Sequence, residues 1–87
     1  MIENIFFVGI GGSGMSGIAR ILNRQQHIIS GSDRDRDLGN RPEYYAGMEA
    51  SGISLYPQDG SGVHDKLDYL VTSTAVEATI PDIQHAR

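Results

Sequence analysis

The first third of the chain contains two patterns of apolar residues: a continuous run, and after it a series at helical spacing. The run Ile-Phe-Phe-Val ends a predicted strand over residues 3–8. Both of its faces are apolar, as expected of a central parallel strand covered on two sides. An amphipathic helix is predicted from about residue 13 to 25, because the next apolar residues follow the i, i+3, i+4, i+7 spacing. These residues are Met15, Ile18, Ala19 and Leu22.

Further apolar runs predict that strands and helices continue along the chain. Residues 27–31, 53–56 and 68–73 predict three further strands, and a second helix is expected over 41–51. A last helix is expected to begin at Pro81. The fold class predicted is therefore α/β, a Rossmann-like open parallel sheet with helices on both faces and the strand order 3-2-1-4.

The length allows one small domain, because the chain has 87 residues. The last predicted helix has only begun where the chain stops, so we expect residues 1–87 to be a fragment of a larger multidomain protein.

A glycine-rich turn joins the first strand to the first helix. Four of the six residues at 9–14 are glycine, and Gly9, Gly11 and Gly14 match the fingerprint Gly-x-Gly-x-x-Gly. A turn without Cβ atoms lets phosphates approach the backbone, and the N–H groups of the helix then face them. We predict a phosphate-binding turn for a nucleotide-like ligand. The alternative is that the glycines serve only close helix–sheet packing.

The same turn nearly matches the Gly-x-x-x-x-Gly-Lys-Ser/Thr loop of nucleotide triphosphatases. Met15 stands where that loop has its lysine. Without this cation the chain is not expected to hydrolyse a nucleotide triphosphate by itself.

Two further candidate sites follow strands. Asp33 lies 19 residues beyond Gly14, at the spacing where doubly wound folds bind ribose hydroxyls. The alternative is a turn or N-cap aspartate. The charged segment 34–40 is predicted to be a solvated loop. The last strand is followed by three residues that are predicted to contact a sugar or base: Ser73, Thr74 and Ala75. The alternative is that they form an ordinary loop at the end of the strand. Parallel strands bring these positions to one edge of the sheet.

Composition excludes several classes of function. The formal net charge of −4 argues against broad attraction to nucleic acid or anionic membrane, and no cysteine is present for disulfides or thiolate metal sites. No apolar run approaches the ~20 residues of a membrane span, and no signal peptide is visible. We expect a cytoplasmic protein with no nucleic-acid or membrane partner.

The glycine turn and the later strand ends together resemble the N-terminal domain of the Mur ligases, and within that family the members that act on UDP-N-acetylmuramate. The turn continues as Gly-Ile-Gly-Gly-Ser-Gly-Met-Ser-Gly-Ile-Ala over 9–19, with Gly-Ser-Asp at 31–33. Val-Thr-Ser-Thr-Ala-Val at 71–76 is similar to the family's Val-Val-Ser-Ser-Ala-Ile. Ile-Pro-Asp-Ile at 80–83 is similar to its Asn-Pro-Glu-Ile.

The resemblance implies a UDP-sugar-binding domain of an ATP-dependent amide ligase of peptidoglycan synthesis. Diphosphate contacts would come from Gly11, Gly12, Ser13, Gly14 and Met15. Asp33, Ser73, Thr74 and Ala75 would lie near the uridine. ATP and Mg²⁺ would act in the central ATPase domain, and a C-terminal domain would help to bind the amine. We expect neither cofactor nor catalysis in residues 1–87 themselves.

Two other functions remain open from the residues alone. The fingerprint and Asp33 also permit an NAD(P)-binding domain of an oxidoreductase or regulatory protein. A non-catalytic interaction domain would keep the glycines for packing only.

Replacing Gly11 by a bulky residue is expected to remove phosphate-dependent binding from a domain that still folds.

Overall fold

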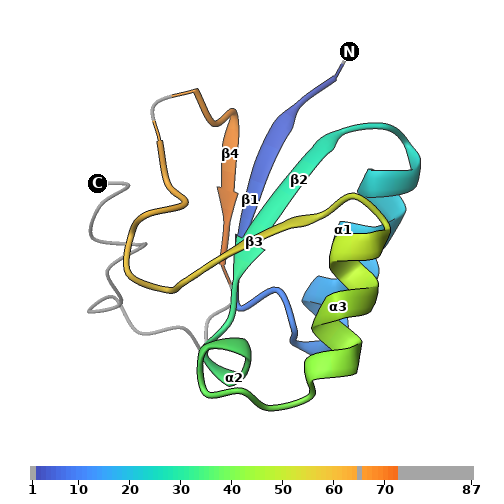
Figure 1. The fold of residues 1–87 in the computed structure, drawn as a ribbon. Coiled ribbons are helices and arrows are strands. Elements are labelled where there is room, and N and C mark those ends of the chain that lie inside the picture. The colour runs from blue at the N-terminus through green and yellow to red at the C-terminus, as the bar shows by residue number, and fades with distance from the viewer. Residues whose placement is uncertain (1, 65, 73–87) are drawn as a thin grey trace.

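The computed structural model describes residues 2–64 and 66–72. They form four strands and three helices (Figure 1). The elements are β1 (Asn4–Val8), α1 (Ser13–Arg24), β2 (Ile28–Ser32), α2 (Arg34–Asp37), α3 (Pro42–Ala50), β3 (Ser54–Tyr56) and β4 (Tyr69–Val71).

The strands form one parallel sheet in the order β3-β2-β1-β4. β1 lies between β2 and β4, with Phe7 opposite Gly31 on one side and Val71 on the other. This confirms the predicted α/β class, the open parallel sheet and its strand order, whereas helices on both faces are not seen within the described residues. The predicted helix from Pro81 and the strand exit after residue 72 lie outside the described residues.

Helices α1 and α3 cover the same face of the sheet (Figure 1). Ile5 and Phe7 of β1 point to this face and are buried with Ala19 of α1 and Met48 of α3. Both crossovers run in the same direction across the sheet, from β1 to β2 to β3, and right-handed connections place their helices on one side. Both helices therefore pack on one common core.

The packed stripe of α1 differs from the predicted one at a single residue. Ala19 is fully buried, and Met15 and Leu22 pack against the core, but the side chain of Ile18 is 51% exposed. The helix rests on the sheet through the small Ala19, so the stripe runs along the i, i+4 and i+7 positions. The i+3 position turns toward solvent.

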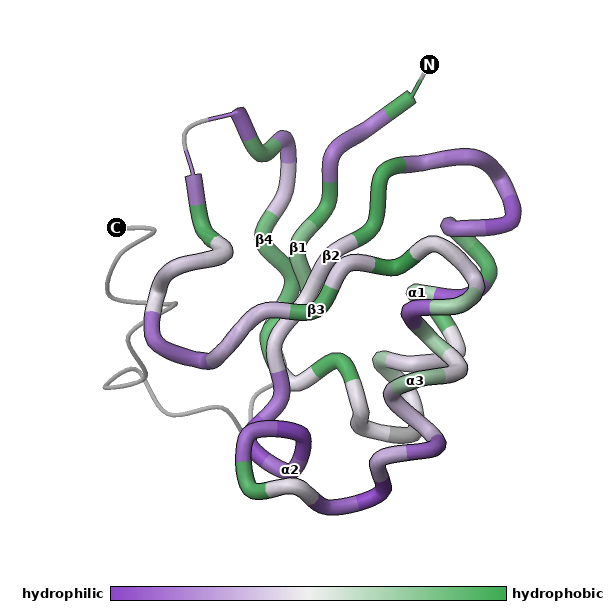
Figure 2. The backbone as a smooth tube through the Cα atoms, in the orientation of Figure 1, coloured by the Kyte–Doolittle hydropathy of each residue, from purple (hydrophilic) through white to green (hydrophobic). Residues whose placement is uncertain are grey.

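The opposite face of the sheet carries a second, smaller core. Phe6 and Val8 are buried there against Val63, with Leu67 and Leu70 partly buried beside them. Within the described residues this face is covered by the segment between β3 and β4 and not by a helix. Figure 2 shows the apolar residues concentrated along the sheet, whereas α2 is hydrophilic.

The segment predicted as a solvated loop contains a short helix, α2. The side chain of Asp33 caps it by accepting a hydrogen bond from the Asp35 N–H at 2.9 Å. None of the helix's own residues is buried. Its charge pattern therefore correctly indicated exposure but not conformation, because a single capped turn needs no apolar face.

The pairing of β1 with β2 depends on the absence of a side chain at Gly31. A Cβ at this position would lie 2.7 Å from the Phe7 carbonyl oxygen and 2.8 Å from the Ile10 side chain. We predict that Gly31→Ala lowers the free energy of unfolding in urea by roughly 1–3 kcal/mol. Gly47→Ala is the matched control, since a Cβ there meets nothing within 4 Å. It should raise stability by about 0.5–1 kcal/mol. Equal stability of Gly31→Ala and wild type would contradict the close approach.

Candidate functional site

The turn between β1 and α1 is fastened to the end of β2. Gly9 adopts the left-handed region with φ 79°, which a glycine enters without steric cost. The N–H groups of Gly9 and Ile10 both donate to the Ser32 carbonyl oxygen, at 2.8 and 3.0 Å. The Gly12 N–H donates back to the Gly9 carbonyl at 3.1 Å. The turn therefore has one defined conformation relative to the sheet.

The start of α1 presents unpaired backbone donors. Its N-cap, Gly12, has no side chain to accept from them, and the first turn contains no acidic residue. Among the described residues, the N–H groups of Gly14 and Met15 have no acceptor, as expected for the first turn of a helix. A Cβ on Gly14 would meet nothing within 4 Å, so the space beside these donors is open. This geometry, with the helix dipole, favours an anion.

Gly11 has a different environment from the other glycines of the turn. Its N–H donates to Oδ2 of Asp33 at 2.7 Å. A Cβ at this position would run into the hydroxyl of Tyr45 and lie 2.8 Å from the Asp33 carboxylate. The absence of a side chain at Gly11 is thus already required by the fold. A larger residue at this position would displace these buried side chains and disturb the fold. The expectation that such a variant loses phosphate binding while its fold stays intact is therefore wrong.

Asp33 is buried and accepts hydrogen bonds from three segments of the chain. Oδ2 binds the Gly11 N–H, whereas Oδ1 accepts from the Asp35 N–H and the Tyr45 hydroxyl, each at 2.9 Å. The N-cap alternative considered for this aspartate is therefore confirmed. The contact with a ribose stays a prediction.

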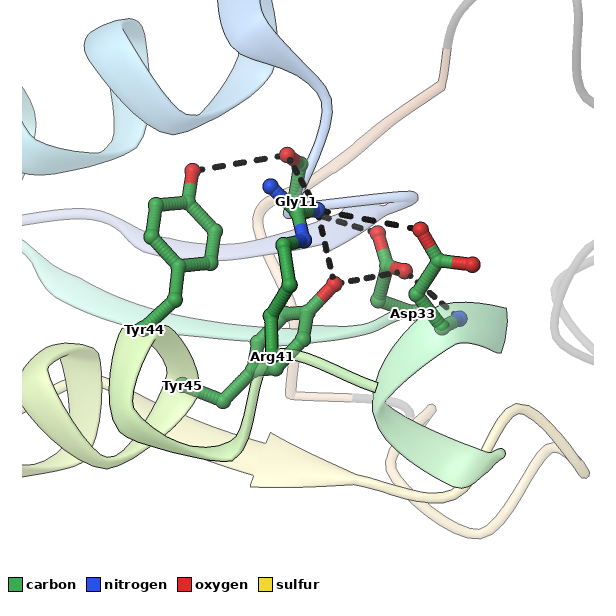
Figure 3. Close-up of polar contacts among 6 residues, drawn as sticks. Gly11, Asp33, Arg41, Tyr44 and Tyr45 are labelled. Carbon is green, nitrogen blue, oxygen red and sulfur yellow. Dashed lines mark hydrogen bonds and ion pairs between the residues drawn. The ribbon is translucent and has the colours of Figure 1, made fainter. Parts of the chain in front are cut away.

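Three side chains from the start of α3 close over Gly11 (Figure 3). The Gly11 carbonyl oxygen accepts from Nη2 of Arg41 at 3.3 Å and from the Tyr44 hydroxyl at 3.4 Å. Nη2 of Arg41 also donates to the Tyr45 hydroxyl at 3.2 Å. The sequence pattern predicts Arg41 only as the first residue of a helix. Its role depends on a contact across 30 residues that no local motif signals.

The surroundings of these side chains shift their pKa values. Burial, followed by the hydrogen bond to Asp33, raises the pKa of Tyr45 to about 12. The phenol therefore stays neutral and donates to the carboxylate. The pKa of Arg41 is raised chiefly by its hydrogen bond with Tyr45, so the guanidinium keeps its charge.

A surface hollow of about 610 Å³ lies on the other side of Tyr45. Asn40, Pro42, Pro57 and Gln58 are among the residues that line it, and none of residues 9–15 does. Tyr45 contacts both this hollow and the network at Gly11. The hollow and the network at Gly11 therefore meet at Tyr45.

The predicted site residues fall into three groups. Gly12, Gly14 and Met15 lie at the open start of α1, with Ser13 between them. Gly11 and Asp33 lie in the internal network described above. Ser73, Thr74 and Ala75 lie outside the described residues. Within residues 2–64 and 66–72, no cluster of three or more His, Cys, Asp or Glu side chains could hold a metal ion. No helix in this part of the chain is long and apolar enough to cross a membrane.

The chain belongs to the Mur ligase family. The family model described as "Mur ligase family, catalytic domain" matches residues 4–87. The UDP-N-acetylmuramate–L-alanine ligase of a Polaromonas species is 40% identical over 86 residues, which are 99% of this chain and 17% of that protein. The ligase of the same name from Neisseria meningitidis is 40% identical over 94% of this chain and 16% of its own length. The chain thus spans about a sixth of these relatives.

Solved structures agree with this assignment. The crystal structure of a UDP-N-acetylmuramate–alanine ligase from Thermotoga maritima superposes with a TM-score of 0.81 and 30% identity. It covers 98% of this chain and 19% of the solved one. A UDP-N-acetylmuramate:L-alanyl-γ-D-glutamyl-meso-diaminopimelate ligase from Neisseria meningitidis has a TM-score of 0.79 over 97% of this chain and 25% of its own. At 24% identity this second match supports the fold alone.

Because the pKa of Tyr45 is raised, the free energy of unfolding should fall as the pH rises through the alkaline range. The folded pKa of about 12 exceeds the ordinary value near 10, so the folded state holds this proton more tightly. The stabilisation is complete below pH 10 and is lost as the pH rises toward 12. We predict that urea unfolding at pH 9, 10 and 11 shows a decline in wild type that Tyr45→Phe does not share. Its full extent should be on the order of 2–3 kcal/mol. Parallel declines in both proteins would contradict the assignment.

Proposed function

We propose that this chain binds the UDP part of UDP-N-acetylmuramate or a related UDP-sugar. The observation that carries the proposal is the open start of α1, where the N–H groups of Gly14 and Met15 have no acceptor in the described part of the chain. A diphosphate is the ligand group that best matches unpaired donors at the positive end of a helix. Membership of the Mur ligase family supports this ligand over a nicotinamide dinucleotide.

The ligand groups can be assigned to parts of the site on this proposal. The diphosphate would bind Gly12, Ser13, Gly14 and Met15, while Gly11 and Asp33 would hold the turn in shape. The uridine would lie toward the carboxyl ends of the other strands, where Ser73, Thr74 and Ala75 were predicted to contact it. The hollow beside Tyr45 adjoins this network, and its largely apolar lining includes polar side chains such as Asn40 and Gln58, a mixture that a nucleoside could use.

In the complete protein, we propose that this domain is the N-terminal one of an ATP-dependent ligase of peptidoglycan synthesis that acts in the cytoplasm. The relatives named as UDP-N-acetylmuramate–L-alanine ligases support an enzyme that joins an acid to an amino acid. ATP and Mg²⁺ would bind to further domains of the same protein. Residues 1–87 would contribute binding and orientation of the UDP-sugar.

Two glycines of α1 allow a matched test of the binding site. A Cβ meets nothing within 4 Å at either Gly14 or Gly17, so alanine should be tolerated by the fold at both positions. At position 14, however, the added methyl group would occupy the space through which phosphate reaches the backbone. We predict that Gly14→Ala weakens the binding of UDP-N-acetylmuramate about tenfold or more, as measured by calorimetry. Gly17→Ala should bind like wild type.

Two results would decide against the proposal. Unchanged affinity of Gly14→Ala would show that phosphate does not approach the backbone at this turn. Failure of the wild-type chain to bind UDP-N-acetylmuramate, with NADH binding in its place, would support the nicotinamide alternative.

A further inference from the structure

Arg41 is held against the glycine turn from several sides. Its Nη2 donates to the Gly11 carbonyl oxygen and the Tyr45 hydroxyl. The centre of the guanidinium lies 4.4 Å from the centroid of the Tyr44 ring, within the range of a cation–π interaction. A half-exposed ion pair of 3.7 Å joins the same nitrogen to Asp35. These contacts fix the position of a long side chain that would otherwise be mobile.

Much of the hydrogen-bonding capacity of Arg41 remains unused. Every polar contact described above involves Nη2, so the N–H groups on Nε and Nη1 have no acceptor among the described residues. A guanidinium has five N–H donors, of which these are three. The side chain is also 49% exposed. A second group could therefore bind Arg41 without breaking its contacts with the turn.

The backbone conformation at Arg41 and its position at the start of α3 do not favour an arginine. It is the N-cap of α3 and has no side-chain capping hydrogen bond. Its φ of 47° and ψ of 52° lie in the left-handed region, which an arginine adopts at some cost. Asparagine would suit both the cap and this conformation better. Unlike asparagine, however, arginine reaches the Gly11 carbonyl oxygen with its guanidinium.

The geometry points to Arg41 as the cation that binds the diphosphate of the UDP-sugar. This inference rests on the proposed function. In the related triphosphatase loop a lysine supplies the positive charge, and this chain has Met15 at that position. The chain as a whole is negative, so an anionic ligand needs a local positive charge. Arg41 brings one to the residue directly before the N-cap of α1, with free donors that match phosphate oxygens.

Arg20 provides an internal comparison. Its guanidinium lies 5.8 Å from the same Tyr44 ring, on the side of α1. No hydrogen bond joins it to the turn among the described residues. Arg20 and Arg41 thus share charge and an aromatic neighbour but differ in contact with Gly11.

The test compares Arg41→Asn with Arg20→Gln in the binding of UDP-N-acetylmuramate at low and moderate salt. Asparagine tolerates the left-handed backbone and can cap α3, which offsets part of the stability lost with the guanidinium contacts, so urea unfolding should show that Arg41→Asn is still folded. Its affinity should be about tenfold lower, the effect of one charge-assisted hydrogen bond. The difference from wild type should shrink as salt rises. Arg41→Lys should recover part of the affinity, and Arg20→Gln should match wild type.

The outcomes separate this inference from the proposed function. If wild type and Arg41→Asn bind equally, Arg41 is not the diphosphate cation, and the proposed function stands. A loss that is independent of salt and not recovered by Arg41→Lys would show that Arg41 only holds Gly11, which overturns the inference. Absence of binding by wild type would overturn both.

Discussion

The buried carboxylate of Asp33 joins three parts of the chain that are distant in sequence. It accepts the Gly11 N–H of the first turn, the Asp35 N–H of α2 and the Tyr45 hydroxyl of α3. Each of these donors would otherwise be left without its partner, at a cost of about 1–3 kcal/mol for a buried group. Together with the bonds from Gly9 and Ile10 to the Ser32 carbonyl, this side chain fixes the position of the glycine turn relative to β2 and α3.

This constraint divides the glycine turn into two functional parts. Gly11 faces inward, where its N–H is bound and its lack of a side chain makes room for Tyr45 and Asp33. Gly14 faces open space at the start of α1, beside N–H groups that have no acceptor among the described residues. Packing thus accounts for Gly11, whereas the phosphate binding that we propose concerns Gly14.

The sequence predicted the sheet well because its signals are local or periodic. Continuous apolar runs at β1 and β2, with the alternation of strands and helices, led to the observed strand order. The turn at residues 9–14 was also found, since its glycine spacing lies within a few residues. Ile18 was misplaced because the helix contacts the sheet through the small Ala19, a detail of packing that the spacing does not contain.

The network at Gly11 could not be predicted in the same way. Asp33 was identified by its spacing, but its partners Arg41, Tyr44 and Tyr45 contact the turn only after α3 has packed on the sheet. A left-handed arginine at a helix N-cap has no sequence signal, because local preferences favour other residues there. Helix α2 was missed since it depends on a single cap from Asp33.

The proposed function requires that the open start of α1 bind the phosphates of a UDP-sugar. The most direct measurement is a titration of the ¹⁵N-labelled chain with UDP-N-acetylmuramate, followed by amide chemical shifts. The Gly14 and Met15 amides should shift most, while the Gly11 amide, already bound to Asp33, should shift little. Saturable binding that leaves the Gly14 and Met15 amides unchanged would contradict the proposed function.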